Sequence, residues 1–198
     1  MKKGWIVLIV IVLLIFIGTS WVTGKYNSFV SMEEGVNQSW SQVENVYQRR
    51  ADLIPNLVET VKGYASQEKE VLIGVTEARA KLGGQVNIGP EVLNNPQAFQ
   101  QFQQAQGALS SALQRLMVVV EKYPELKSDQ RFADLQRQLE GTENRISVER
   151  QRFNEAVQSY NVQIRRFPDA MFAGIFGFQQ KQYFQAQEGA DKAPQVKF

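Results

Sequence analysis

The chain contains no histidine and no cysteine among its 198 residues. The lack of histidine excludes a Ser-His-Asp triad, a histidine metal ligand and a histidine pH switch. The lack of cysteine excludes thiol nucleophiles, disulfide bonds, zinc–thiolate sites and iron–sulfur clusters. We therefore expect no metal and no cofactor, and the composition favours a structural or binding role over an enzymatic one.

The sequence also has almost no net charge. It carries 22 basic and 20 acidic residues, for a formal charge of +2. Lys2 and Lys3 account for this excess, because the remaining chain has equal numbers of basic and acidic residues. A nucleic-acid surface needs clustered Lys and Arg with a strong positive balance. We therefore predict no nucleic-acid partner.

Charge is absent altogether from residues 4–24, and residues 5–17 form an unbroken apolar run. A helix over residues 4–24 would span about 31 Å, close to the thickness of a hydrocarbon core. Tryptophan stands near each end of this segment, where aromatic rings favour the headgroup region. The sequence predicts a membrane anchor with the lipid bilayer as partner, and its marker side chains are Trp5, Ile6, Leu14, Phe16 and Trp21.

The alternative to an anchor is a cleaved signal peptide, but the triplet after the apolar run, Gly18-Thr19-Ser20, is a poor cleavage site. Basic residues favour the cytoplasmic side of a membrane. Because Lys2 and Lys3 outnumber Lys25, we expect residues 1–3 in the cytoplasm and the rest outside a cell membrane. The opposite orientation stays open as the alternative.

The rest of the chain shows the 3-4 spacing of apolar residues that is typical of long helices packed along a shared seam. We predict helices over residues 25–82, from Pro96 to Tyr123, and from Ser128 or Asp129 to Phe167. The seam keeps its phase across Pro55, which favours a kink there over a break. Asn94 or Asn95 supplies a cap before the second helix.

The predicted fold class is therefore all-α: an N-terminal transmembrane helix, then an elongated antiparallel three-helix bundle with a short C-terminal fourth helix. The expected boundaries are a cytoplasmic N-terminus at 1–3, a transmembrane helix at 4–24, a bundle at 25–184 and a flexible tail at 185–198. Residues 83–90 are expected to connect the first two helices of the bundle.

Several separated blocks resemble the LemA family in the expected order. They are residues 49–58 (RRADLIPNLV), 61–65 (VKGYA), 123–127 (YPELK), 132–136 (FADLQ), 139–146 (LEGTENRI), 153–154, 160–161, 167–168 and 177–178. The family more often has tyrosine where Phe153 stands. The resemblance covers residues 26–184 and implies a small single-pass membrane protein with a long helical bundle. The resemblance implies no catalytic residue. It implies an association with membrane proteases as possible partners.

Two candidate interaction sites follow from the residues. The first is a polar cluster at the predicted kink, made of Arg50, Asp52, Pro55 and Asn56. It is either a recognition site or a set of groups that satisfy the backbone freed by proline, with cross-helix partners such as Glu143 or Arg145. The sequence leaves both interpretations open.

The second candidate is an apolar patch near the C-terminus, made of Met171, Phe172, Ile175, Phe176 and Phe178. Three helices of the predicted lengths would place this patch at the end of the bundle remote from the membrane. There it would contact a neighbouring subunit or another protein. The alternative is a short helix folded back on the bundle.

Three functions remain. The first is a non-enzymatic, self-associating scaffold or adaptor at the bacterial cell envelope, present as a homo-oligomer. The second is a regulatory partner of a membrane protease. The third is an extracytoplasmic hydrolase that uses Ser66 and Lys69, an S-x-x-K pair that would share one helix face but has no accompanying K-T-G triplet. We expect the first.

Overall fold

The computed structural model describes residues 2–83 and 89–185, and every regular element in this part of the chain is a helix. The elements are α1 (Lys2–Tyr64), α2 (Lys69–Gly83), the 3-10 helix η1 (Pro90–Asn94), α3 (Pro96–Val120), α4 (Pro124–Lys127), α5 (Gln130–Arg165) and α6 (Asp169–Phe176). The all-α prediction is confirmed. Most of the predicted connection 83–90 and all but the first residue of the predicted tail lie outside the described residues.

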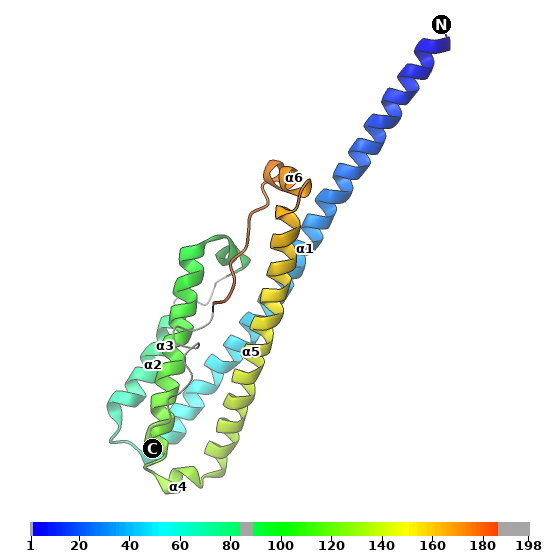
Figure 1. Ribbon diagram of the computed structural model, residues 1–198. Coiled ribbons are helices and arrows are strands. Elements are labelled where there is room, and N and C mark those ends of the chain that lie inside the picture. The colour runs from blue at the N-terminus through cyan, green and yellow to red at the C-terminus, as the bar shows by residue number, and fades with distance from the viewer. Residues whose placement is uncertain (1, 84–88, 186–198) are drawn as a thin grey trace, which may run out of the picture.

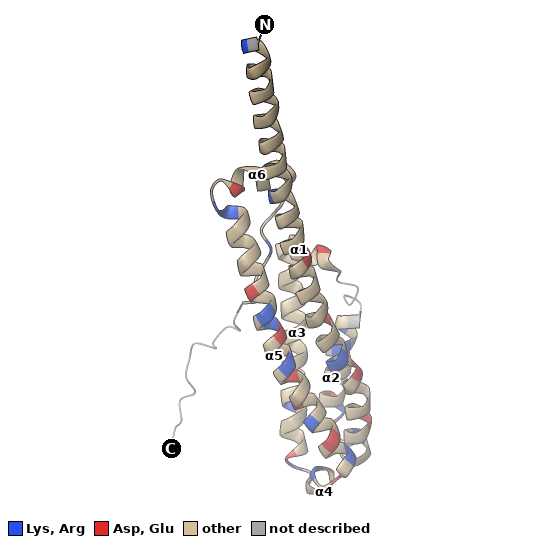
Figure 2. Ribbon diagram, turned by 90° about the vertical axis from the view of Figure 1, so that its right-hand side faces the viewer, with Lys and Arg blue, Asp and Glu red and all other residues tan. Residues whose placement is uncertain are grey.

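Helix α1 combines the apolar N-terminal segment and the first helix of the bundle in one element of 63 residues, about 95 Å long. Its most apolar window has a mean hydropathy of 2.8, and none of that window is buried by the rest of the chain. Figure 2 shows this uncharged stretch standing clear of the bundle. From Phe29 onward the helix buries one face, beginning with Phe29 and Val36. The N-terminal segment thus fits a membrane anchor that continues directly into the core.

The bundle contains four long helices and not three (Figure 1). The first helix ends at Tyr64, and α2 runs back beside it. Helix α3 then returns to the remote end, short α4 turns the chain, and α5 runs back along α1 to the end nearest the anchor. The prediction of one kinked helix over residues 25–82 is wrong, and so is the three-helix arrangement built on it.

The chain reverses at residues 65–68, where the amide of Glu68 donates to the carbonyl of Ala65. Leu72 then donates to the Glu68 carbonyl as α2 begins. Gly63 and Ser66 weaken the helix at this point, because both residues have lower helix propensity than alanine. The 3-4 spacing of apolar residues continues across this turn because α1 and α2 face the same core, although they run in opposite directions. Continuity of an apolar stripe therefore does not prove continuity of a helix.

Pro55 lies inside α1, and the helix continues through it. Proline has no backbone N–H, so the carbonyl four residues earlier, that of Ala51, loses its helical donor. Arg79 on α2 replaces that donor: its Nε lies 2.9 Å from the Ala51 oxygen. The side chain of a neighbouring helix thus satisfies the defect that the proline creates.

The predicted helix starts are confirmed at two caps. The Asn95 side chain accepts hydrogen bonds from the amides of Gln97 and Ala98, ahead of Pro96 in the first turn of α3. The Asp129 side chain accepts from the amides of Arg131 and Phe132 at the start of α5. Tyr64, the last residue of α1, donates its hydroxyl to Asp129 at 2.8 Å, which ties two helix ends together.

Two hydrophobic clusters fill the bundle. The membrane-side core contains Phe29, Val36, Trp40, Val43, Tyr47, Val92, Leu93, Phe99, Phe102, Ile146, Phe153, Val157, Tyr160, Ile164, Ala173 and Phe184. The remote core contains Ile54, Leu57, Val61, Ala65, Leu72, Val75, Leu82, Leu109, Leu113, Leu116, Val119, Val120, Leu126 and Phe132. Buried Arg50 and Gln106 stand between the two clusters along α1 and α3.

Candidate functional site: a polar groove beside the C-terminal strap

The chain after α6 returns along the bundle as a non-helical segment, residues 178–185, which we call the C-terminal strap. Two asparagines of α5 hold it. The side chain of Asn161 donates to the Lys181 carbonyl at 2.9 Å and accepts from the Lys181 amide at 3.0 Å. Asn154 makes the same two bonds with Phe184, at 3.1 and 2.9 Å. Each asparagine therefore pairs with the strap as a neighbouring strand would.

The spacing of these pairs follows from helix and strand geometry. Seven residues of α5 separate Asn154 from Asn161, which corresponds to about 10.5 Å along the helix. Three residues of extended chain, from Lys181 to Phe184, also span about 10 Å. The two asparagines thus match an extended chain that runs antiparallel to α5.

Lys181 belongs to the strap and is buried against the bundle, with only 5% of its surface exposed. Its ammonium lies 2.5 Å from a Glu33 carboxylate oxygen and 2.6 Å from the Asn94 side-chain oxygen. The Tyr160 ring lies beneath it, with 5.8 Å between the nitrogen and the ring centroid. Because buried charges need partners, these contacts fix the strap to α1, η1 and α5 together.

A polar groove of about 520 Å³ begins where the strap ends. Helix α3 forms one wall, α5 forms the other, and α1 contributes the floor. Its glutamines are Gln100, Gln103, Gln104, Gln106, Gln114 and Gln185. Gln185 belongs to the strap, and its amide donates to Gln103 at 3.1 Å. The strap therefore enters the same groove.

The charged side chains that line the groove are Arg50, Arg150 and Glu143. Arg50 is 1% exposed, and its guanidinium donates to Ser110 at 2.9 Å and to Gln106 Oε1 at 2.5 Å. It also forms an ion pair with Glu143 at 3.0 Å, and that carboxylate stays half exposed. Arg150 lies above the Phe184 ring and donates to the Gln185 carbonyl. Burial raises the pKa of Tyr47 on the groove floor, so its phenol remains neutral.

The predicted polar cluster at Pro55 is divided by the structure. Arg50 points into the bundle, and its pairing with Glu143 agrees with the interpretation that the cluster serves cross-helix contacts. Asp52, Pro55 and Asn56 lie on the exposed face of α1, where Asp52 accepts a local bond from Gln48. The freed carbonyl is satisfied by Arg79 and not by Asn56.

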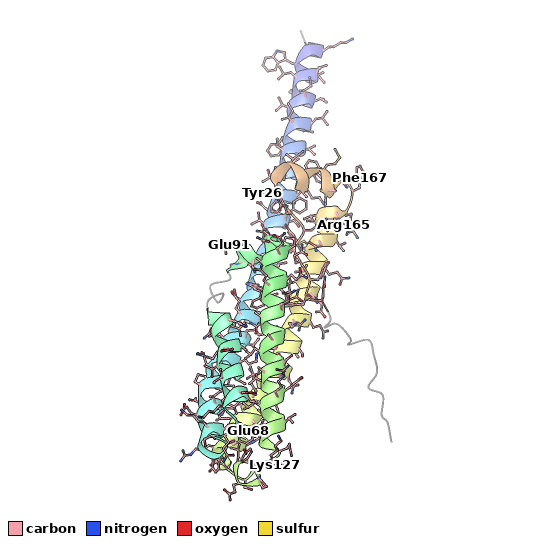
Figure 3. All side chains as sticks on the ribbon, turned by 90° about the vertical axis from the view of Figure 1, so that its left-hand side faces the viewer. Tyr26, Glu68, Glu91, Lys127, Arg165 and Phe167 are labelled. Atoms are coloured by element: carbon pink, nitrogen blue, oxygen red, sulfur yellow. The ribbon has the colours of Figure 1, made fainter. Side chains whose placement is uncertain are left out.

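The predicted C-terminal patch forms α6 and the residues after it, at the end of the bundle next to the anchor (Figures 1 and 3). The expectation that it lies remote from the membrane is wrong, because α2 adds one more reversal of the chain. Phe172 packs edge-on against Trp21, with ring centroids 5.2 Å apart. Phe176 packs edge-on against Tyr26 at the same centroid distance of 5.2 Å, and the Phe178 ring lies tilted against Tyr26 at 5.8 Å. Met171 and Ile175 stay exposed.

An ion pair fixes α6 to α1. Asp169, the first residue of α6, is 1% exposed and lies 2.9 Å from the ammonium of Lys25. Gln163 of α5 donates to the same carboxylate. Gly177 ends α6 with φ = 78°, a left-handed conformation that favours glycine, and Phe178 donates back to the Ala173 carbonyl.

The remaining predicted residues are all exposed. Trp5, Ile6, Leu14 and Phe16 lie on the free part of α1, as expected for side chains that face lipid. Ser66 lies in the turn after α1, whereas Lys69 begins α2. The expected common helix face for the Ser/Lys pair is therefore wrong, since the two residues are not on one helix.

Sequence reasoning missed the strap and its asparagines. A signal was present: an aromatic residue followed by asparagine occurs twice in α5, seven residues apart, at residues 153–154 and 160–161. In each pair the aromatic side chain is buried in the membrane-side core. Each asparagine stands beside it and faces the strap. In this chain, the two asparagines at heptad spacing mark the face of α5 that receives the strap.

Together these features define a class: an all-helical bundle protein whose first helix fits a membrane anchor and whose surface carries an extended C-terminal segment. The sequence comparisons agree, because the LemA family profile matches residues 39–198. The chain belongs to the LemA family.

Three relatives illustrate the family. The chain is 30% identical to magnetosome protein MamQ 1 of Paramagnetospirillum magneticum over 182 residues, which covers 84% of this chain and 67% of that protein. The same values hold for magnetosome protein MamQ of Magnetospirillum gryphiswaldense. Protein LemA of Metamycoplasma hominis is 22% identical over 144 residues, which covers 73% of this chain and 61% of that protein.

Proposed function

We propose that the protein is a non-enzymatic, membrane-anchored scaffold or adaptor, and that the groove between α3 and α5 binds an extended segment of polypeptide. The observation that carries this proposal is the pairing of Asn154 and Asn161 with the strap. It shows that side-chain amides of this bundle can serve both the N–H and the C=O of an extended chain. The groove continues from that pairing and is lined by amides of the same kind.

The chemistry of the groove suits such a segment. A glutamine amide has both a donor group and an acceptor oxygen, so it can donate to a backbone carbonyl or accept from a backbone N–H. Gln103 already accepts a bond from the strap at Gln185. The guanidinium group of Arg150, which is only partly buried, favours a carboxylate, for which arginine is the preferred partner. The expected ligand is therefore an extended polypeptide with at least one acidic side chain.

The proposed location is a cell membrane at the bacterial cell envelope. Residues 1–3 lie in the cytoplasm and the bundle lies outside, in the orientation that the two N-terminal lysines favour. The opposite orientation is the alternative. Two of the relatives are named magnetosome proteins and the third is not. We therefore do not propose a magnetosome role for this protein.

The ligand segment has two sources. A second copy of the chain would make the protein a self-associating scaffold, and a different membrane protein, such as a protease, would make it an adaptor. Deletion of residues 170–184 would not separate these cases, because Lys181 and Phe184 are buried and their loss would disturb the bundle. A probe placed at one exposed position of the groove avoids that problem.

The test is photo-crosslinking of the full chain in native membranes. A photoreactive phenylalanine replaces Gln104, which is exposed on the groove wall, and in the control it replaces Val118, which is exposed elsewhere on α3. We expect a polypeptide adduct at position 104 and little at 118. Mass spectrometry of the crosslinked peptide identifies a second copy or another protein.

A matched pair of variants tests the charge argument. Ser111 is exposed and also lines the groove. Ser111→Glu should reduce the adduct at position 104, because it repels an acidic segment, whereas Ser111→Gln should leave it unchanged. Equal adduct yields at positions 104 and 118 would contradict the proposal.

A further inference from the structure

The exposed side of α6 is an apolar surface at the end of the bundle that faces the anchor. Phe167, Met171 and Ile175 expose 80%, 61% and 75% of their surface. Met171 and Ile175 are four residues apart and share one face of α6, and Phe167 precedes that face in the turn. An exposed apolar helix face of this kind marks a contact with a membrane or with another protein.

The position of α6 along α1 determines what this surface contacts. The uncharged run of α1 ends at Gly24 and is about as long as a hydrocarbon core is thick. The boundary of the hydrocarbon therefore falls near Trp21, the residue whose ring meets Phe172. The ion pair from Lys25 to Asp169 and the Tyr26–Phe176 contact place α6 at the same level.

Charge at this level fits a membrane surface. Arg165 and Arg166 directly precede Phe167, and both are exposed. Figure 3 shows Arg165 and Phe167 side by side at the anchor end of the bundle, opposite the end that carries Glu68 and Lys127. Arginines beside exposed aromatic and aliphatic side chains are the combination by which interfacial helices bind anionic lipid.

We infer that α6 is an interfacial helix that inserts Phe167, Met171 and Ile175 into the headgroup–acyl boundary of the membrane that α1 spans, while Arg165 and Arg166 contact anionic lipid headgroups. The inference rests on the proposed anchor. Through Asp169 and the strap, this second contact holds the bundle at a fixed tilt to the bilayer.

Depth-dependent fluorescence quenching tests this inference on the full chain. The chain contains no cysteine, so one introduced cysteine carries one environment-sensitive fluorophore. The three single variants are Ile175→Cys on α6, Leu13→Cys in the anchor and Val118→Cys at the remote end of α3. Each is reconstituted in vesicles of mixed zwitterionic and anionic phospholipid, with a nitroxide quencher near the headgroup or near the end of the acyl chain.

We expect the label at position 175 to lose most of its fluorescence to the shallow quencher and little to the deep one. The label at 13 should respond most to the deep quencher, and the label at 118 to neither. If position 13 is quenched and position 175 is not, the inference is overturned and the anchor stands. If position 13 is not quenched either, the anchor and the inference both fail. A label at 175 that is blue-shifted but unquenched lies against protein, which also overturns the inference.

Discussion

The two halves of the bundle are built from different side chains. In the membrane-side core, four rings from three segments surround Trp40, which packs against Phe99 and Phe102 of α3, Phe153 of α5 and Phe184 of the strap with centroids 5.3 to 6.0 Å apart. The remote core is almost entirely aliphatic, with Phe132 as its one aromatic residue fully buried among those described. Aromatic rings bury more area per residue and constrain the geometry of their neighbours.

The two halves also differ in the segments that close their cores. The remote core is closed by helices alone, whose seams meet by the ridges-into-grooves packing of any bundle. The membrane-side core is closed in part by the strap, which contributes Phe184 and the buried Lys181. The aromatic side chains of this half thus form the surface against which the extended strap packs.

The largest effect should come from Trp40→Ala, compared with Leu109→Ala in the remote core. Both side chains are fully buried. Each substitution leaves a cavity, and we expect losses in the free energy of unfolding of about 3–5 kcal/mol for Trp40 and about 2–4 kcal/mol for Leu109. Chemical denaturation in detergent measures both.

Cleavage by trypsin at Lys181 sharpens this comparison, because that site is buried while the strap is in place. Trp40→Ala should accelerate the cleavage, since its ring stacks on Phe184. Leu109→Ala should not, when both variants are compared at equal fractions folded. Equal acceleration would mean that the two halves form one packing unit.

A smaller effect is expected at Pro55, where Arg79 of α2 donates to the carbonyl that the proline leaves without a helical donor. Arg79→Met leaves the Ala51 carbonyl without a donor, which should lower the free energy of unfolding by about 1–3 kcal/mol. In a Pro55→Ala background the new backbone N–H can serve that carbonyl. The cost of Arg79→Met should then fall by at least about half. A cost that is the same in both backgrounds would mean that Arg79 acts only through packing.

The smallest effect concerns the pH dependence of the remote end. The amide of Phe132, together with the Tyr64 hydroxyl, lowers the pKa of Asp129 below its ordinary value of 3.8. Because the folded-state pKa is depressed, this carboxylate stabilises the fold above that ordinary value, and the contribution is lost as pH falls through the folded pKa.

Asp129→Asn provides the control, because asparagine can still cap α5 but does not titrate. The stability of the native chain should decline more steeply below pH 4 than that of Asp129→Asn, as measured by thermal unfolding in acid. Parallel profiles for the two chains would show that the Asp129 cap does not contribute through its charge.

The sequence predicted the buried seams and the helix caps better than it predicted the path of the chain. The 3-4 spacing of apolar residues identified nearly all the buried positions of α3 and α5, and the caps at Asn95 and Asp129 followed from local chemistry. The turn at residues 65–68 escaped detection because both flanking helices share one core and therefore one phase. That single error displaced α6 to the wrong end of the bundle.

The strap could not be predicted from periodicity. An extended segment held by side-chain amides has no helical repeat, and its buried residues, Lys181 and Phe184, follow no apolar pattern. The groove was missed for the same reason, because glutamines on a helix surface also occur where no ligand binds. Arg50 was predicted as part of a polar cluster at Pro55, but its inward direction depends on Gln106 and Glu143, which are distant in sequence.

The most direct test of the account is hydrogen exchange of Phe184→Ala and the native chain, both at full length in nanodiscs. The account holds that an extended strap completes the membrane-side core independently of the remote core. It predicts faster amide exchange in residues 96–104 and 153–164 of the variant, with α2 and residues 109–120 unchanged. Exchange that accelerates equally in both halves, or in neither, would contradict it.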